Sequence, residues 1–376
     1  MMDSFITKDG RRLRCGYTTG TCAAAAAKSA AFMLLTGGTL KKVQIVTPHG
    51  DELELELCDV VLSDKYASCG IVKDSGDDPD VTNGMTVYAM VEKTAVPNTV
   101  EIDGGQGIGR VTKPGLDQSV GSAAINSTPR RMITEEVMQV CNECGYTGGL
   151  KVIISAPAGV EIAKRTFNSK LGVVGGISIL GTSGMVEPMS EEAVIESIAL
   201  EIRQRKALGD KILILTPGNF GSDFLKAVYG IPDERIVKFS NYVGKALEAA
   251  VEAGFKQVLM AGHIGKFVKL SGGIMNTHSK EGDLRSELMS KASQLAGADS
   301  ETANAMSGCV TTDEMLRILK EKGFLASTME ELKKQIEYEL SARFGGKLEI
   351  GVIVFTTGNV ELFKTDTAEK WLEDYL

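Results

Sequence analysis

The second half of the chain alternates apolar segments with helix-forming segments, and this alternation constrains the fold more than any other feature. Apolar and β-branched runs occupy 211–215, 235–239, 257–261 and 348–355, and helix-forming sequence separates them. Strands that are joined by helices form parallel sheets, whose two faces the helices cover. We therefore predict a Rossmann-like parallel-sheet α/β domain over residues 208–376.

The first half mixes hairpins with helices, which predicts an α+β domain over residues 1–207. An alanine-rich run favours a helix from Cys22 to Leu35, because alanine is the best helix former. The alternating Leu and Glu residues of 52–57 predict a half-buried hairpin strand that pairs with 43–46. Further strands are expected at 68–73, 86–92, 99–102, 152–155 and 176–180, and helices at 130–144 and 190–206.

Charge and hydropathy exclude several classes of protein. Lys and Arg number 41 against 49 Asp and Glu, and a net charge of −8 disfavours a nucleic-acid-binding protein. No run approaches the ~18 apolar residues of a membrane span, and the N-terminus lacks the apolar stretch of a signal peptide. Seven cysteines with no regular spacing fit a reducing compartment. We expect a cytoplasmic protein.

Each strand of the second half runs into a loop of small and polar residues. In open parallel sheets the ligand crevice lies outside the carboxyl ends of the strands, so these loops predict a small-molecule pocket. Gly and Asn also end strands and cap helices without binding a ligand. A dinucleotide site is not predicted, because the first loop lacks G-x-G-x-x-G and the second strand does not end in an acid. The pocket candidates are Gly218, Asn219, Gly221, Ser240, Asn241, Gly262 and Gly265.

The first half contains a glycine-rich run and a threonine-rich helix start, each of which could bind an anion or a nucleotide. The run Gly105–Arg110 resembles a nucleotide fingerprint, but Arg110 replaces its third glycine and no helix follows, so a glycine-rich turn is predicted. The residues Thr18–Thr21 precede the alanine-rich helix, where free N–H groups and hydroxyls favour a bound anion. The same residues also form an ordinary helix cap.

Few residues are candidates for acid–base or metal chemistry. His263 and His278 lie in loops rich in Gly, Asn and Thr, where a histidine can move protons, although their spacing fits no compact metal motif. Cys141 and Cys144 share a helix face without a second Cys or His pair, so they are interpreted as packed thiols rather than a zinc site. We predict no metal site in the protein.

Five blocks of the chain carry a specific pattern of residues. The first two blocks are Gly16–Lys28, with the sequence GYTTGTCAAAAAK, and Asp103–Gly115, with the sequence DGGQGIGRVTKPG. The other three are Ala124–Asn126 with Pro129–Ile133, Gly176–Gly184 with Val186–Ser190, and Ala261–Leu270 with Gly272–Ser279. These blocks resemble the family of cobalt-precorrin-5B C-1-methyltransferases, CbiD. They occur in order over most of the chain, so the resemblance is specific.

The resemblance implies transfer of a methyl group from S-adenosyl-L-methionine to C-1 of cobalt-precorrin-5B, giving cobalt-precorrin-6A in anaerobic cobalamin biosynthesis. Cobalt would then arrive inside the substrate, a tetrapyrrole with many carboxylate arms. The fold implied is distinct from that of the enzymes that methylate other positions of the ring. Two alternatives remain open: an NAD(P)H-dependent reductase of the same pathway, and a non-catalytic corrinoid carrier. The oligomeric state is not predicted.

A polyanionic substrate requires local positive charge on an acidic protein. If a base removes a proton during the transfer, the candidate is His263, whose pKa a nearby Lys266 would lower; a delocalised macrocycle would need no base. The seven pocket candidates after the strands of the second half would hold the methyl donor. Candidate substrate-binding residues are Thr18, Thr19, Gly20, Thr21, Arg110, Lys113, Arg130, Arg131, Lys266, Lys269, Asn276 and His278.

Overall fold

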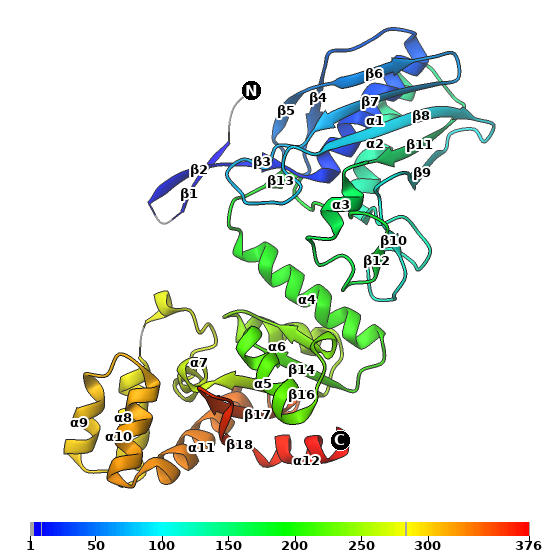
Figure 1. Ribbon diagram of the computed structural model, residues 1–376. Coiled ribbons are helices and arrows are strands. Elements are labelled where there is room, and N and C mark those ends of the chain that lie inside the picture. The colour runs from blue at the N-terminus through cyan, green and yellow to red at the C-terminus, as the bar shows by residue number, and fades with distance from the viewer. Residues whose placement is uncertain (1–3, 9, 283, 376) are drawn as a thin grey trace. The chain divides into compact units, whose positions relative to one another are not determined.

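The computed structural model describes residues 4–8, 10–282 and 284–375, and the chain divides into two compact units, Met1–Ser190 and Glu191–Leu376 (Figure 1). The division falls seventeen residues earlier than the predicted 207/208, and those residues are helix α4 (Glu191–Ala207). Ile198 and Ile202 of α4 are buried in the core of the second unit, which explains the earlier boundary. The mixed α/β class is confirmed.

The first unit contains a five-stranded sheet in the order β6-β7-β8-β11-β9. Its pairs are antiparallel except β11 with β9, which is parallel. Helices α1 and α2 pack against this sheet (Figure 1). The bounds are β6 Cys58–Leu62, β7 Tyr66–Val72, β8 Thr86–Thr94, β9 Val100–Gly104, β11 Gly149–Ser155, α1 Thr19–Thr36 and α2 Ser127–Glu143.

Helix α1 explains the alanine run. All five alanines of 23–27 are fully buried, and the thiol of Cys69 in the sheet approaches the Ala26 carbonyl at 3.3 Å. Small side chains let the helix lie close to both the sheet and α2. The helix begins one turn before the predicted Cys22, because Thr18 is its N-cap and Thr21 donates its backbone N–H to the Thr18 hydroxyl.

Short paired segments complete the first unit. The predicted hairpin is present as β4 (Lys42–Val46) with β5 (Glu52–Glu56). The predicted strand at 176–180 is wrong: Ile177 and Ile179 form only isolated bridges, to Ile108 and Ile125, and both are buried. The alternating apolar residues therefore indicated burial correctly, but they do not form a paired β-strand. The other short elements are β1 Phe5–Lys8, β2 Arg11–Arg14, β3 Gly16–Tyr17, β10 Arg110–Val111, β12 Val173–Val174, β13 Met185–Val186 and α3 Gly159–Ala163.

The second unit contains the predicted parallel sheet, in the order β15-β14-β16-β17-β18. The pairs β14–β15, β14–β16 and β16–β17 are parallel, while β18, which was not predicted, is antiparallel to β17. The bounds are β14 Ile212–Thr216, β15 Ile236–Lys238, β16 Gln257–His263, β17 Glu349–Thr356 and β18 Val360–Lys364.

Helices cover both faces of this sheet. Leu213 and Leu215 of β14 face a core that includes residues of α4, α6, α8, α10 and α11, whereas Ile214 faces one with α5 and α12. This alternation follows from the period of two in a strand. The helices are α5 Asn219–Tyr229, α6 Val243–Glu252, α7 Ile264–Phe267, α8 Arg285–Leu295, α9 Ser300–Ser307, α10 Thr312–Lys322, α11 Leu325–Phe344 and α12 Asp366–Tyr375, with 3-10 turns at Asp233–Arg235, Val268–Gly272 and Ser279–Glu281.

Candidate functional site

The strand order of the second unit creates a switch point between β14 and β16. From β14 the chain continues to β15 on one side, and β16 and β17 lie on the other side. The helices that follow β14 and β16 pack on opposite faces, since Phe224 of α5 and Phe267 of α7 belong to different cores. A crevice is expected at such a point, outside the carboxyl ends of the two strands.

The predicted glycines at this edge fall into two groups. A Cβ added to Gly218 would meet no atom within 4 Å, so this residue faces open space. A Cβ on Gly221 would lie 2.6 Å from Thr216, and one on Gly262 would lie 2.2 Å from the Phe267 ring. Gly265 is also tightly packed, against His263. Gly221 and Gly262 are therefore required by packing, and Gly218 is the glycine of this group that leaves room for a ligand.

The polar candidates at the same edge also hold loops in place. The Asn219 side-chain oxygen accepts a hydrogen bond from Lys238 Nζ at 3.1 Å. Ser240 has a left-handed backbone, with φ of 57°, and its carbonyl accepts a hydrogen bond from Lys266 Nζ at 3.2 Å. The backbone carbonyl of Asn241 accepts a hydrogen bond from the Thr277 backbone N–H at 2.9 Å. Lys266 thus connects the loop after β16 with the loop after β15, across the end of β14.

His263 ends β16 and caps α7. Its Nδ1 accepts the backbone N–H of Gly265 at 3.1 Å, so the neutral ring carries its proton on Nε2. Burial lowers the pKa of His263, while the Asp313 carboxylate acts in the opposite direction. The lowered pKa agrees with the sequence-based expectation, but its cause is burial rather than Lys266. Burial also lowers the pKa of Lys266, and the charge of Lys269 adds to this effect.

Asp313, at the start of α10, is a residue of this edge that the sequence analysis missed. Its carboxylate accepts hydrogen bonds from the hydroxyls of Thr356, which ends β17, and Thr357, which follows it. These hydrogen bonds lower the pKa of Asp313. The available signal was the helix cap at Thr311, which accepts the Glu314 backbone N–H and places Asp313 in the first turn of α10.

Three predicted substrate-binding residues make contacts that hold a loop of the second unit. Lys269 is 3% exposed, and its Nζ donates to the carbonyls of Thr277, His278 and Gly282. Nδ1 of His278 accepts the Lys280 backbone N–H, and Asn276 accepts the His278 backbone N–H. Lys269 is therefore the anchor of the loop that contains the other two.

A cavity of about 650 Å³ lies along α6, between α4 and the end of α11. Asn276 and Tyr242 line it, together with Met275 and Phe344. Its walls carry three carboxylates and three cations, so the cavity offers no net charge to a polyanion. These residues are Glu191, Glu248, Glu252, Lys245, Arg343 and Lys347.

In the first unit, the protein itself covers the start of α1. The hydroxyl of Thr19 donates to the Leu180 carbonyl and accepts the Leu180 backbone N–H, and the hydroxyl of Thr21 donates to the Gly184 carbonyl. The backbone N–H of Gly20 also donates to Leu180. Thr18, Thr19 and Thr21 are at most 6% exposed. The structure thus shows a capped helix whose polar groups are used within the unit.

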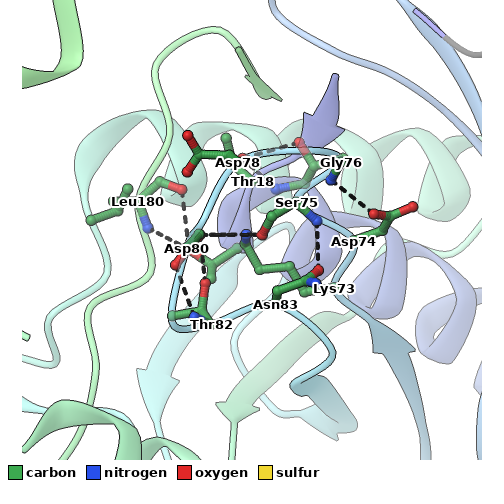
Figure 2. A network of polar contacts seen from close by, with 12 residues as sticks. Thr18, Lys73, Asp74, Ser75, Gly76, Asp78, Asp80, Thr82, Asn83 and Leu180 are labelled. Carbon is green, nitrogen blue, oxygen red and sulfur yellow. Dashed lines mark hydrogen bonds and ion pairs between the residues drawn. The ribbon is translucent and has the colours of Figure 1, made fainter. Parts of the chain in front are cut away.

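A network of polar contacts lies beside this helix start, in the loop 73–84 (Figure 2). The ammonium group of Lys73, 2% exposed, lies 2.7 Å from the Asp80 carboxylate and donates to the Ser75 hydroxyl. Burial acts to raise the pKa of Asp80, but hydrogen bonds from Lys73 and Thr82 lower it overall. The sequence analysis missed this network, and four aspartates within 74–80 were the available signal.

Each of these four aspartates has a partner in the first unit. Asp74 forms a bidentate pair with the Arg14 guanidinium, and Asp77 accepts the Arg14 backbone N–H. Asp78 accepts the Met189 backbone N–H. Since the carboxylates hold the loop together, its acidity has a structural explanation.

The predicted cations of the first unit differ in their surroundings. Arg110 forms a bidentate pair with Asp103, and Arg130 donates to the carbonyls of Ile102, Ala123 and Ile125. Burial lowers the pKa of Arg130. Arg131 is exposed and lies 3.9 Å from Glu135, and Lys113 donates to the Lys170 carbonyl.

Two features are absent from the described part of the chain. Within it, three or more His, Cys, Asp or Glu side chains are nowhere grouped so that they could hold a metal ion. No helix among the described residues has both the length and the apolar character that crossing a bilayer requires.

Comparison with known proteins identifies the family. The family model described as CbiD matches residues 6–188, and the model described as CbiD, C-terminal domain, matches residues 276–366. A protein of Ruminiclostridium cellulolyticum named cobalt-precorrin-5B C(1)-methyltransferase is 47% identical over 96% of this chain and 94% of its own length. The chain belongs to the CbiD family.

Other CbiD relatives bear the same name. The protein of Alkaliphilus metalliredigens is 44% identical over 99% of this chain and 97% of its own length, and that of Clostridioides difficile is 36% identical over the whole of both. A solved structure described as the cobalamin biosynthesis protein CbiD from Archaeoglobus fulgidus is 28% identical, covers 74% of this chain and 87% of its own, and gives a TM-score of 0.40. The CbiD resemblance of the five sequence blocks is confirmed.

Proposed function

We propose that the chain transfers a methyl group from S-adenosylmethionine to C-1 of cobalt-precorrin-5B. The observation that carries this proposal is the CbiD membership, with relatives named for that reaction matching 94% to 100% of their own lengths. The reductase and carrier alternatives lack such support. Seven free cysteines fit a reducing cytoplasm as the site of the reaction.

The proposal places the methyl donor at the carboxyl edge of the β14–β18 sheet. Gly218 supports this placement, because its neighbourhood is open where Gly221 and Gly262 are packed. Phe220, which follows in the first turn of α5, is 82% exposed. An exposed aromatic ring beside an open backbone suits a ligand that carries a flat base. The residues present therefore fit S-adenosylmethionine.

When bound, S-adenosylmethionine supplies a methyl group that its sulfonium already makes electrophilic. The protein's task is then to hold the reacting carbon in line with this methyl and to exclude water. Lys266 constrains the orientation, because an ammonium group repels a sulfonium and attracts a carboxylate. We place a carboxylate, of the donor or of the substrate, near Lys266 and the sulfonium away from it.

The role of His263 follows from its tautomer. Because Nδ1 accepts the Gly265 N–H, Nε2 carries the proton and is a hydrogen-bond donor. In this state the ring orients an acceptor group of a ligand. To act as the base, His263 would have to give up the cap of α7. His263 as general base stays a prediction, and the cap favours an orienting role.

Calorimetric titration with S-adenosylhomocysteine tests where the donor binds. Gly218→Val adds bulk into open space and leaves an extended backbone unchanged, with φ of 175°. We expect at least a tenfold loss of affinity, about 1.4 kcal/mol, and an unchanged melting temperature. Gly38→Val is the matched control, since Gly38 lies in the first unit and a Cβ there would touch only Thr36, at 3.6 Å.

Two outcomes would count against the proposal, and they are distinct. If Gly218→Val binds S-adenosylhomocysteine as tightly as the unmodified chain, the donor lies elsewhere although the reaction still stands. If the unmodified chain binds no S-adenosylhomocysteine and does not methylate cobalt-precorrin-5B, the proposed function itself is wrong.

A further inference from the structure

A surface of the first unit combines positive charge with exposed apolar side chains. It is built from the segments 104–116 and 163–186, which contain no Asp or Glu. Together they carry five basic residues, in a chain whose net charge is −8. The basic residues are Arg110, Lys113, Lys164, Arg165 and Lys170. Arg110 and Lys164 are paired with Asp103 and Glu161, which lie just outside the segments, so the charge offered to a ligand comes mainly from Lys113 and Arg165. We call these two segments the basic surface.

Glycines lock the two segments together. A Cβ on Gly176 would lie 2.2 Å from the Gly107 carbonyl oxygen, and one on Gly109 would lie 2.3 Å from Val173. The Gly109 backbone N–H donates to the Ile177 carbonyl at 2.8 Å, and the Ile177 backbone N–H donates to the Gly107 carbonyl at 2.9 Å. This glycine contact has no space for side chains, so it explains the run Gly105–Arg110 without a nucleotide. It also gives the surface a rigid base.

The ribbon of β10 and β12 shows which way the side chains point. Val111 and Val173 are opposite each other and are 2% and 3% exposed, so one face of the ribbon is packed. Arg110 and Val174 are opposite each other on the other face, where Val174 is 56% exposed. Figure 1 shows β10 and β12 side by side, next to α3.

The loop after α3 brings an aromatic ring to the same surface. Asn168 donates its side-chain amide to the Gly176 carbonyl at 3.2 Å and accepts the Val173 backbone N–H at 2.8 Å. Phe167, its neighbour, is 70% exposed. Lys113 donates to the Lys170 carbonyl, which joins the two segments at a second place. Arg165 is exposed two residues before Phe167.

We propose that the basic surface binds the polycarboxylate macrocycle of the substrate, with Phe167 against the face of the ring and Lys113 and Arg165 paired with its carboxylate arms. This inference rests on the proposed function. The charge is complementary to a polyanion, and cations pair strongly with carboxylates. A flat conjugated ring offers an apolar face to the exposed Phe167 side chain. The surface thus matches both parts of such a ligand.

The test uses the full-length chain and cobyrinic acid, a cobalt corrin with free carboxylates, followed by its visible absorbance. Lys113→Glu with Arg165→Glu should weaken binding at least about tenfold and reduce its dependence on salt. Lys41→Glu with Lys65→Glu changes the net charge equally on exposed residues of the same unit, and it should change affinity less than twofold. Phe167→Ala should weaken binding about three- to tenfold while leaving the salt dependence unchanged.

S-adenosylhomocysteine titration separates failure of the surface from failure of the function. All four proteins should bind S-adenosylhomocysteine equally, which also shows that they are folded. If Lys113→Glu with Arg165→Glu binds cobyrinic acid as the unmodified chain does, or if the control pair weakens binding equally, the surface is not the binding site. If the unmodified chain does not bind cobyrinic acid at low salt, the assignment is also overturned. Loss of S-adenosylhomocysteine binding and turnover in the unmodified chain would instead reject the proposed function.

Discussion

Two helix starts look alike in the sequence and differ in the structure. Helix α1 begins at Thr19, within Thr18–Thr21, and α5 begins at Asn219, after Thr216–Gly218, so both helix starts contain small and hydroxyl residues. At α1 the segment 180–184 covers the start and uses the hydroxyls of Thr19 and Thr21. At α5 a Cβ on Gly218 would meet nothing within 4 Å.

The difference lies in a segment that is distant along the chain. Leu180 and Gly184 contact α1 although they lie more than 150 residues further along the chain. The neighbouring Ile179 accepts the backbone N–H of Asn126, the residue that precedes α2. Local sequence sets the capping chemistry of a helix start, while tertiary packing decides whether its polar groups remain available. A helix start is therefore a candidate site only where no other segment covers it.

The largest loss of stability is expected from the buried charge of Lys73, which lies beside the covered start of α1. Lys73→Met removes the partner of Asp80, and removing one partner of a buried pair costs about 3 kcal/mol of unfolding free energy at the low end of the usual range. The low end applies because the Asp80 side chain is still 26% exposed. Hydrogen–deuterium exchange of peptides covering 66–94 should show the loss in the first unit.

The double variant Lys73→Met with Asp80→Asn is the control for that change. It removes the unpaired charge, so about half of the lost stability should return. If the double variant is as unstable as Lys73→Met alone, the pairing is not the source of the effect. The helices of the second unit should exchange at unchanged rates in both variants.

A smaller effect should distinguish the two helix starts directly. In Gly20→Ala the new methyl would lie 2.8 Å from Pro129 and 3.2 Å from the Leu180 carbonyl. Such overpacking costs about 1–3 kcal/mol. Gly218→Ala places the same methyl in open space, so it should leave the unfolding free energy unchanged. Urea denaturation of the two variants compares them, and equal values would mean that both starts are equally open.

The cap of α1 should contribute about 1 kcal/mol. Thr18→Val keeps the shape of the side chain but removes the acceptor for the Thr21 N–H. Thr18→Ser keeps that acceptor and serves as the control. Thermal unfolding should place Thr18→Ser close to the unmodified chain and Thr18→Val below it. A Thr18→Ser variant as unstable as Thr18→Val would assign the effect to the lost methyl group instead.

The smallest effect concerns pH in the open region. Burial lowers the pKa of His263 in the folded chain, so the unfolded chain binds the proton more readily. The resulting stability is complete above about pH 6.5 and is lost as the pH falls below it. His263→Asn keeps an acceptor for the Gly265 N–H but does not titrate. Its unfolding free energy should therefore fall less between about pH 6.5 and 5 than that of the unmodified chain, and identical slopes would contradict this account.

The periodic parts of the fold were predictable from sequence. The parallel sheet of the second unit, the 43–57 hairpin and the alanine-rich helix follow from apolar periodicity and helix propensity, which are local properties. The segment 176–180 was not, because its bridges reach Ile108 and Ile125, which are distant in the chain. Strand β18 was missed although it forms a local hairpin with β17, because the loop after 348–355 was interpreted as part of the pocket rather than as a hairpin turn. The boundary moved because α4 packs with the core that follows it.

The candidate site was predictable as a place rather than as a set of contacts. The rule for open parallel sheets pointed to the loops after β14 and β16, and the structure then distinguished the open Gly218 from the packed Gly221 and Gly262. It did not show that Lys269 is buried and donates to three backbone carbonyls, because the sequence does not distinguish a buried lysine from an exposed one. Asp313 was missed because helix α10 reaches the sheet edge from outside the strand–loop pattern.

The contact between Gly107 and Gly176 also has a consequence for how the first unit folds. Helix α2, strand β11 and helix α3 all lie between these glycines along the chain. The backbones of Gly107 and Gly176 meet only after the long loop between them has closed. Closing such a loop costs chain entropy, which opposes folding. Chains whose contacts are long in sequence fold more slowly. The surface proposed to receive the substrate is therefore completed late, after the intervening elements are in place.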